Sequence, residues 1–192
     1  LFNNDYQLIL KDKPNNIRLI TKQIDFFDYH LSETKNAFTK LLKRTHAYKH
    51  RFANTPSIRP LYGPILSKFG MRRHPITGKR KKHKGIDIAA WAGAPIKSTA
   101  DGIVEYADWS GTFGYAVVIN HNYGFQTIYA HCSQLLIKKG DYVKKGLIIA
   151  QVGSTGISTG PHLHYEVRKW RRAISPTKFL DLDLYTAIRT IW

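Results

Sequence analysis

Two histidines one residue apart, His162 and His164, follow a Gly-Pro corner and begin the run HLHYEVR. In an extended strand successive side chains point to opposite faces, so both imidazoles share one face while Leu163, Tyr165 and Val167 share the other. Imidazoles bind metals and transfer protons near neutral pH. Histidine is also an ordinary, partly buried polar residue. The significance of the pair therefore depends on which residues the rest of the chain places beside it.

Two further stretches offer partners for this pair. In HKGIDIA, His83, Gly85 and Asp87 stand at even separations, so an extended chain puts them on one face, and Gly85 leaves room between the other two side chains. In QTIYAHCS the same alternation puts Tyr129 and His131 on one face. Three strands thus supply imidazoles and a carboxylate that can converge on one site.

This set of residue types fits a catalytic zinc site. Such a site takes three protein ligands from His and Asp or Glu and keeps a fourth position open for water. The metal lowers the pKa of bound water to about 7, and a neighbouring imidazole can accept the proton or stabilise the developing oxyanion. The motifs HxxxD and HxH each recur by chance, but their combination with Gly85 and the Gly-Pro corner predicts a metal-dependent hydrolase. More than three candidate ligands are present, which leaves groups for proton transfer.

The elements that must position these residues read as short strands. From Leu61 onward, short apolar runs alternate with Gly, Asp and Asn, with no helical period until near the C-terminus. Their spacing predicts a mainly β fold, an antiparallel sheet that is barrel-like or sandwiched. Ser175-Pro176 predicts a short closing helix with proline at its first position. The expected strands lie in GIDIAA, APIKS, GIVEYA, YAVVINH, FQTIYAH, YVKKGLIIAQVG and HLHYEVR.

A long N-terminal helix is predicted at residues 17–55, after an N-terminal segment at 1–16. Apolar residues recur there at alternating spacings of four and three, a heptad seam interrupted by two threonines. The helix would be roughly 50 Å long, more than a small domain needs for its own core. It either packs across its own domain or serves as a docking or dimerisation helix. The seam consists of Ile20, Ile24, Phe27, Leu31, Thr34, Phe38, Leu41, Thr45, Tyr48 and Phe52.

Pro56 and Pro60 end this helix, and residues 56–63 read as a linker. A catalytic domain at 64–178 and a C-terminal tail at 179–192 complete the predicted organisation. No apolar run approaches the roughly 20 residues of a membrane span, and no signal peptide is recognisable. Because the chain starts at Leu1, an export signal or membrane anchor upstream of it remains an expectation.

The net charge of +17, from 30 Lys and Arg against 13 Asp and Glu, indicates an anionic partner. Seven of the basic residues lie in RRHPITGKRKKHK, residues 72–84. Nucleic acid is disfavoured because the aromatic residues that stack on bases in single-strand binders are not interleaved with these charges. The single cysteine, Cys132, excludes an intramolecular disulfide and a cysteine-based zinc knuckle.

From about Pro64 to Pro176 the sequence resembles the LytM and lysostaphin type of zinc metallopeptidases, which cut peptide bonds in bacterial peptidoglycan. The small departures are Cys132 where Leu is usual and Tyr165 where Phe is common. A barrel of the biotinyl or lipoyl carrier type also resembles part of this region, but it leaves the metal-site residues unexplained. The stretches that carry the peptidase resemblance are SKFGMRRHP, HKGIDIAAWAGAPI, ADGIVEYA, TIYAHCS and VKKGLIIAQVGSTGISTGPHLHYEVR.

The resemblance implies a role for each candidate residue. His83, Asp87 and His164 would bind a Zn²⁺ ion, and His131 and His162 would be the catalytic pair beside it. The metal would lie in a groove walled by loops, flanked by the basic segment 72–84. Free carboxylates of peptidoglycan stem peptides would account for that charge. Candidate substrate-binding residues are Arg72, Arg73, Tyr129 and Thr159.

The function expected from the resemblance is hydrolysis of peptidoglycan cross-links. A D,D-endopeptidase of the Gram-negative type, which remodels the wall and determines cell shape from the periplasm, is favoured. The long helix would then bind a second copy of the chain or a paralogue. The alternative is a non-catalytic relative that binds cell wall or activates another hydrolase. Such relatives usually lack zinc ligands, whereas this chain retains the whole set.

Overall fold

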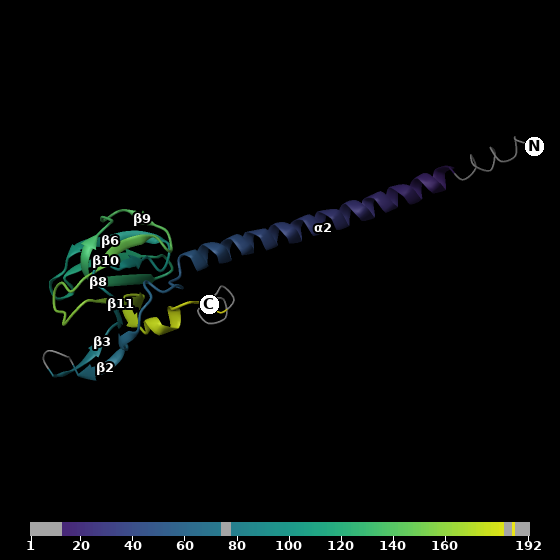
Figure 1. Ribbon diagram of the computed structural model, residues 1–192. Coiled ribbons are helices and arrows are strands. Elements are labelled where there is room, and N and C mark those ends of the chain that lie inside the picture. Colours follow the sequence, from purple (N-terminus) through teal and green to yellow (C-terminus); the bar gives the residue numbers. More distant parts are fainter. Residues whose placement is uncertain (1–12, 74–77, 183–185, 187–192) are drawn as a thin grey trace, which may run out of the picture. The chain divides into compact units, whose positions relative to one another are not determined.

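The computed structural model describes residues 13–73, 78–182 and 186 of the 192 (Figure 1). It divides into two units, residues 1–47 and 48–192. Most of the segments predicted at 1–16 and 179–192 lie outside the described residues. The fold class predicted from the sequence, mainly antiparallel β with one long N-terminal helix, is confirmed.

Helix α2 spans Lys13–Ala53, so it begins four residues before the predicted start and ends two residues before the predicted end. Four threonines of the helix donate a hydrogen bond from Oγ1 to the backbone carbonyl four residues earlier, as Thr34 does to His30. No helix among the described residues is long and apolar enough to cross a membrane. The large exposed apolar side chains of α2 are Ile17, Leu19, Ile20, Ile24, Phe26, Phe27, Tyr29, Leu31, Phe38, Leu41 and Leu42.

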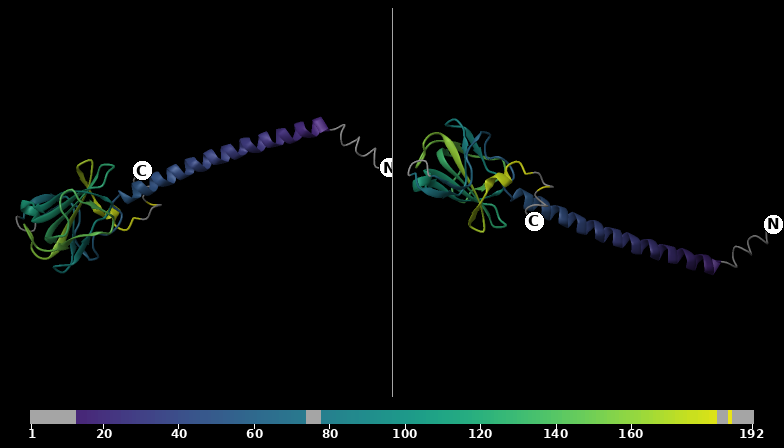
Figure 2. Two further views of the ribbon diagram at one scale, coloured as in Figure 1. Left: turned by 90° about the horizontal axis from the view of Figure 1, so that it is seen from above. Right: turned by 90° about the horizontal axis from the view of Figure 1, so that it is seen from below.

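The larger unit is built on a ten-stranded antiparallel sheet (Figures 1 and 2). Its main path runs β1, β4, β11, β8, β7, β6, β9, while β10 pairs with β5 and β8, and β12 with β11. The strands are β1 Ile65–Ser67, β4 Ile86–Ala89, β5 Pro95–Lys97, β6 Gly102–Trp109, β7 Tyr115–Asn120, β8 Phe125–Leu135, β9 Tyr142–Val143, β10 Ile148–Val152, β11 His162–Lys169 and β12 Arg172–Ile174.

The basic segment forms a hairpin. Strands β2 (Gly70–Arg73) and β3 (Arg80–His83) make a separate two-stranded antiparallel sheet. Sequence reasoning missed these strands because a run of lysines and arginines has no apolar alternation. The expected single run YVKKGLIIAQVG is likewise two strands, β9 and β10, separated by a turn in which Gly146 has a φ of 87°.

The predicted alternation of β11 is confirmed by which side chains join the apolar core, although His164 and Glu166 on the other face are buried as well. Leu163, Tyr165 and Val167 are fully buried in the core. They pack with apolar side chains from β4, β7, β8 and β10. The predicted closing helix is present as the short 3-10 helix η2 (Pro176–Phe179), with Ser175 before it and proline at its first position.

The segment predicted as a linker is part of the folded unit. Thr55 and Ser57 are buried, the Ser57 amide donates to the Thr99 carbonyl, and the Lys97 amide donates to the Pro60 carbonyl. The half-buried side chain of Lys145 donates from Nζ to the Phe52 carbonyl and to Ser57 Oγ. The last helical turn and the residues after it therefore fold with the β-sheet. The helix ends before the prolines as expected, but the residues around them belong to the folded unit and do not form a separate linker.

Candidate active site

The site is organised by the pairing of β4 with β11. Asp87 and His164 are directly opposed in this pair, and Asp87 Oδ1 lies 2.8 Å from His164 Nδ1. Gly85 precedes β4 where the chain passes close to β11. A Cβ atom there would lie 2.3 Å from the Tyr165 carbonyl oxygen. The glycine is thus required by the closeness of the two backbones.

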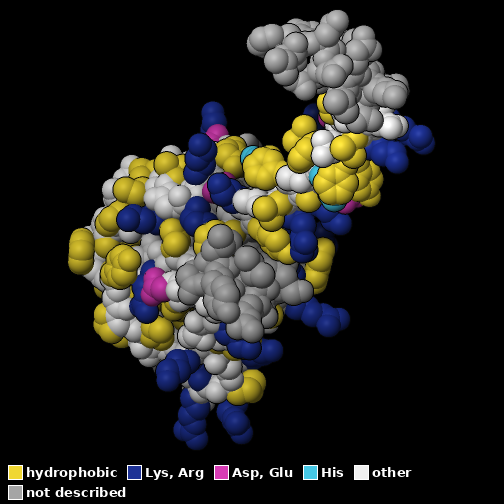
Figure 3. All heavy atoms as spheres, turned by 90° about the vertical axis from the view of Figure 1, so that its right-hand side faces the viewer, with side chains coloured by type: hydrophobic (Ala, Val, Ile, Leu, Met, Phe, Trp, Pro, Cys, Tyr) yellow, Lys and Arg dark blue, Asp and Glu magenta, His cyan; other side chains and the backbone are white. Residues whose placement is uncertain are grey.

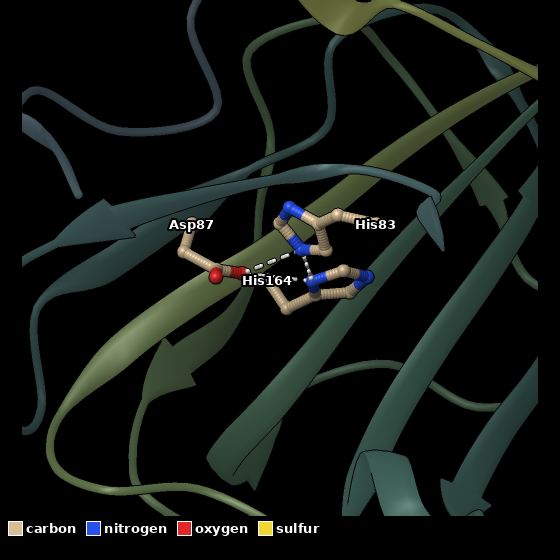
Figure 4. Close-up of side chains that lie close together, drawn as sticks. All are labelled: His83, Asp87 and His164. Carbon is tan, nitrogen blue, oxygen red and sulfur yellow. Dashed lines mark hydrogen bonds and ion pairs between the residues drawn. The ribbon is translucent and has the colours of Figure 1, made fainter. Parts of the chain in front are cut away.

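The last residue of β3 adds a third ligand atom. His83 Nε2 lies 3.2 Å from Asp87 Oδ1 and 3.1 Å from His164 Nδ1 (Figure 4). The three residues form a group whose ligand atoms all lie within 4.8 Å of one another. Each residue is only 7% exposed. Three strands that are separate in the sequence therefore converge on one point.

The outer nitrogens of the two histidines determine what the inner atoms can do. His83 Nδ1 faces the Lys68 carbonyl at 2.9 Å, and His164 Nε2 faces Glu166 Oε1 at 3.2 Å. Both partners accept hydrogen bonds, so each ring donates outward and its inner nitrogen carries a lone pair. Two such lone pairs and a carboxylate oxygen face one another, an arrangement that needs a cation between them.

A zinc ion fits this donor set. Two imidazole nitrogens and a carboxylate oxygen are ordinary zinc ligands, and adjacent ligand atoms around tetrahedral zinc are roughly 3.3 Å apart. The three measured separations, 2.8, 3.1 and 3.2 Å, are close to that spacing. Three protein ligands leave the fourth position for water.

The neighbouring histidines keep the carboxylate of this group ionised. Burial by itself raises the pKa of Asp87, but hydrogen bonds and charge from His164 and His83 outweigh it and hold that pKa far below its usual value. Burial lowers the pKa of His164, but its contacts with Asp87 and Glu166 outweigh this and raise the pKa, so a metal that binds at Nδ1 must displace any proton held there. The carboxylate is therefore ionised across the physiological range.

His131 reaches the site through a bulge in β8. Tyr115 of β7 lies opposite Cys132, whereas Val117 lies opposite Tyr129, so β8 contains an extra residue between these two pairs. His131 has a φ of 63°, in the left-handed region. This local turn breaks the strict alternation. As a result, the His131 side chain lines the groove whereas the Tyr129 side chain lies in the core.

The assignment of Tyr129 to substrate binding therefore needs correction. Its side chain is fully buried beside Tyr165, with the ring centroids 5.3 Å apart. Its hydroxyl group accepts a hydrogen bond from the Thr99 amide at 2.9 Å. Tyr129 is a core residue, and the uniform alternation assumed from the sequence does not hold across the bulge.

His131 and His162 lie side by side next to the ligand group. Their ring centroids are 4.8 Å apart, and His162 Nε2 lies 3.9 Å from Asp87 Oδ1. The Nδ1 atoms face the carbonyl oxygens of Thr155 and Gly160, each at 2.7 Å. Each ring thus donates from Nδ1 and keeps Nε2 available as an acceptor. Burial lowers the pKa of His131 to about 4, so this imidazole is neutral near pH 7.

A groove of about 500 Å³ contains all five of these residues. Of the predicted substrate-binding residues, Arg72 and Thr159 line it, whereas Arg73 is exposed on the same hairpin and does not. Arg72 Nη2 donates to Asp87 Oδ2 at 3.1 Å. The basic segment thus flanks the groove as predicted and also contacts a ligand residue. The groove is lined further by Lys81, Lys82, Lys84, Thr112, Phe113, Ile157, Ser158 and Glu166.

Three residues of the site were missed from the sequence. Phe113, in the connection between β6 and β7, stacks on His164 with ring centroids 5.6 Å apart. Thr155 holds His131 through its carbonyl group and donates from Oγ1 to the Cys132 carbonyl. Glu166 lies two residues after His164 in β11 and lines the groove, but it was given no role from the sequence. Only Glu166 carried a signal, as a charged residue two positions after His164 in a buried strand.

A comparison with protein-family models matches residues 81–176 to the model described as Peptidase family M23. That match covers half of the chain and contains all five site residues. It does not include helix α2.

Curated relatives are similar over the same region. The chain is 46% identical over 121 residues to the DD-carboxypeptidase/endopeptidase Mpg of Neisseria meningitidis, covering 62% of this chain and 28% of Mpg. It is 43% identical over 118 residues to the peptidoglycan DD-endopeptidase ShyB of Vibrio cholerae, covering 61% of this chain and 28% of ShyB. The chain therefore spans less than a third of the length of these relatives.

A solved structure has the same fold. The crystal structure of a zinc-containing peptidase from Vibrio cholerae superposes with a TM-score of 0.60 at 41% identity. The superposition covers 69% of this chain and 40% of that one.

Proposed function

The chain belongs to peptidase family M23, and on that basis we propose that it is a zinc-dependent endopeptidase that hydrolyses peptide cross-links of bacterial peptidoglycan. The observation that carries the proposal is the pairing of two kinds of imidazole in one groove. His83, His164 and Asp87 direct their ligand atoms at one point, while His131 and His162 lie beside them with Nε2 free to accept a proton.

The chemistry divides between these two sets. His83, Asp87 and His164 would hold a Zn²⁺ ion. Such an ion would supply a Lewis acid for the scissile carbonyl and would lower the pKa of a water molecule toward neutrality. His131, neutral near pH 7 because burial lowers its pKa, is suited to accept a proton at Nε2. His162 lies close enough to share that proton or to stabilise an oxyanion in the groove.

The substrate class is inferred from the groove and from the names of the relatives. Lys81, Lys82 and Lys84 line the groove, and stem peptides carry free carboxylates that these ammonium groups attract. Thr159 offers a hydroxyl group on the facing loop. Basic side chains also greatly outnumber acidic ones on the face shown in Figure 3. One relative is named a peptidoglycan DD-endopeptidase and another a DD-carboxypeptidase/endopeptidase, which favours the D,D cross-link as the bond that is cut.

The competing function is a non-catalytic relative that binds cell wall or activates another hydrolase. A scaffold of that kind has no need to retain the metal ligands or the two adjacent imidazoles. All five residues are present here and are brought together with consistent hydrogen-bond partners. Catalysis is therefore the better explanation of the site.

A cell-envelope location follows from this substrate, with the periplasm favoured and a role in cell shape as its physiological outcome. The exposed apolar side chains of α2 support a docking role for the helix, with a second copy or a paralogue as partner. Sedimentation of the chain with and without residues 1–47 tests the self-association. A monomer in both cases would rule out the homodimer.

The enzymatic proposal is tested by digesting purified diaminopimelate-type sacculi and analysing the products by mass spectrometry. We expect loss of cross-linked dimers that is abolished by a chelator and by the His162→Ala substitution. A chain that binds zinc but releases nothing from these sacculi or from glycine-bridged ones would contradict the proposal. Cleavage confined to glycine-bridged sacculi would retain the peptidase and correct the bond.

A further inference from the structure

A buried carboxylate lies directly behind one of the ligand histidines. Glu166 is 1% exposed, and its Oε1 atom lies 3.2 Å from His164 Nε2. Its other oxygen, Oε2, accepts hydrogen bonds from Arg168 Nε at 2.9 Å and Nη2 at 2.7 Å. His164, Glu166 and Arg168 follow one another on the same face of β11, two residues apart. They form a continuous chain of contacts that starts at the ligand atom.

His164 differs from the other histidines of the site in how its outer nitrogen is held. The outer nitrogens of His83, His131 and His162 face backbone carbonyls, of Lys68, Thr155 and Gly160. A backbone carbonyl can only accept, so the fold fixes those three rings, and Ser158 Oγ is only a longer, additional contact of His162 Nδ1 at 3.3 Å. The outer nitrogen of His164 faces a side chain. The orientation of this one ligand is therefore under the control of a replaceable residue.

We propose that Glu166, held in place by Arg168, is a positioning residue that keeps the ring proton of His164 on Nε2 and so leaves Nδ1 free to bind the metal. This inference rests on the zinc site proposed above. Outer-sphere carboxylates of this kind fix the tautomer and the direction of a ligand histidine. A ring with its proton on Nδ1 would direct an N–H group at Asp87 Oδ1, 2.8 Å away, and would close the site to a cation.

Arg168 makes the role of the carboxylate testable by an isosteric change. In Glu166→Gln, the guanidinium group of Arg168 still directs two N–H donors at the atom in the Oε2 position. The amide oxygen must therefore face Arg168, and the NH₂ group must face His164 Nε2. That nitrogen can then only accept a hydrogen bond, which forces the ring proton onto Nδ1. The substitution preserves shape but reverses the tautomer.

A purely structural role predicts something different. If Glu166 and Arg168 only stabilise β11 as a buried ion pair, zinc affinity should follow folding stability in every variant. Under the positioning role the two quantities separate. Arg168→Met should lower the thermal midpoint while the carboxylate still accepts from His164. In the double variant Glu166→Gln/Arg168→Met the amide is free to turn its oxygen toward His164.

The experiment measures the zinc dissociation constant of the whole chain by competition with a chelator, beside the thermal midpoint of each metal-free variant. We expect about 10- to 100-fold weaker zinc binding in Glu166→Gln, a smaller loss in Arg168→Met, and recovery in the double variant toward the Arg168→Met value. Nitrogen-15 NMR of the imidazoles should show the His164 proton moved to Nδ1 in Glu166→Gln. The matched control is Glu105→Gln, an exposed carboxylate bonded to Asn120 and Gln126, which should bind zinc as the unmodified chain does.

The outcomes are separable. Zinc affinity of Glu166→Gln equal to that of the unmodified chain overturns the positioning role and leaves the proposed peptidase intact. Weaker binding without recovery in the double variant, or with the His164 proton still on Nε2, also overturns it in favour of the structural role. Failure of the unmodified chain to bind zinc would instead remove the proposed metal site. If Glu166→Gln does not fold, a loss of zinc binding in Arg168→Met as severe as in His164→Ala overturns the positioning role.

Discussion

Asp87 and His164 are opposed residues of one antiparallel strand pair, and the carboxylate oxygen Oδ1 lies 2.8 Å from the imidazole nitrogen Nδ1. The backbone register of β4 and β11 therefore sets the distance between two ligands of the proposed metal. A slip of one residue would turn every side chain of one strand to the opposite face and would remove both the ligands and the core packing.

The two histidines of HxH should respond differently to removal. His164→Ala should lose zinc together with activity, because it removes a ligand atom of the three-residue group. His162→Ala should retain zinc and lose activity by a factor on the order of 10²–10⁴, the usual contribution of a general acid or base. Metal analysis of both purified variants beside the cleavage assay provides the check. Equal zinc loss in the two variants would contradict the division of roles.

Arg72 and Arg73 form a matched pair on one strand of the basic hairpin. Arg72 donates to Asp87 Oδ2 at 3.1 Å, whereas Arg73 is exposed and does not line the groove. Arg72→Ala should weaken zinc binding by about 10-fold or more, since partners of ligand carboxylates commonly contribute that much. Arg73→Ala should leave the zinc dissociation constant unchanged. If the two variants bind zinc alike, the contact of Arg72 with Asp87 has no effect on the metal.

Gly85 should not tolerate a side chain. An added Cβ would lie 2.3 Å from the Tyr165 carbonyl oxygen, which belongs to the backbone of β11 and cannot move without disturbing the pairing with β4. Gly85→Ala should lower the free energy of unfolding by about 1–3 kcal/mol, the cost of overpacking. Zinc affinity should fall as well, because His83 and Asp87 flank this position. Chemical denaturation and zinc titration test both, and wild-type values would show that the strands can separate without cost.

His121 should make stability depend on pH. It is fully buried between the Asp101 carbonyl and Thr127 Oγ1, and burial lowers its pKa from 6.5 to about 4. Between these pH values the unfolded chain binds a proton that the folded chain does not, so stability falls as the pH drops from 6.5 to 4. At about 1.4 kcal/mol for each pH unit, the full effect is about 3 kcal/mol.

The measurement is the free energy of unfolding at several pH values for the unmodified chain and for His121→Asn. The variant should be less stable at neutral pH but should lose less stability on acidification. His46→Asn, on the exposed surface of the helix, is the control and should follow the unmodified chain. Parallel pH profiles for His121→Asn and the unmodified chain would show that this histidine is not the source of the acid sensitivity.

The part of the site predicted from the sequence is the part that obeys simple alternation. In β11 the two-residue period holds from His162 to Val167, because one set of alternate residues joins the apolar core and the other set lines the groove. In β8 the period fails at His131, whose positive φ inserts a bulge that no local sequence feature announces. For that reason Tyr129 was given the wrong surroundings.

Long-range placement was the other limit. The contact of Arg72 with Asp87 depends on how the β2–β3 hairpin is oriented relative to β4. Residue alternation and charge in the sequence do not predict that orientation. The prolines at 56 and 60 correctly ended a helix. Whether the residues after a helix are buried or exposed depends on the tertiary surface beside them. In this protein that surface buries Thr55 and Ser57.

A deletion series should find the folding boundary inside the last turns of the helix. Removal of residues 1–47 leaves the larger unit complete, and this fragment should retain the thermal midpoint and zinc affinity of its β-sheet. Removal of residues 1–55 deletes the carbonyls of Phe52 and Ala53, which accept from Lys145 Nζ and the Asp101 amide, and the buried side chain of Thr55. That fragment should melt at a lower temperature. Equal midpoints for the two fragments would place the boundary at the prolines.

The packing of residues 54–57 also limits how this domain can be recombined with others. A gene fusion that joins a new N-terminal module at the proline-rich stretch would remove residues whose backbone hydrogen bonds and buried side chains belong to the β-sheet unit. Viable exchanges of the N-terminal module should therefore be joined upstream of Tyr48 and should carry over the end of the helix with the sheet. Functional chimaeras are then expected to differ in sequence before Tyr48 and to keep both the last helical turns and the sheet of this domain.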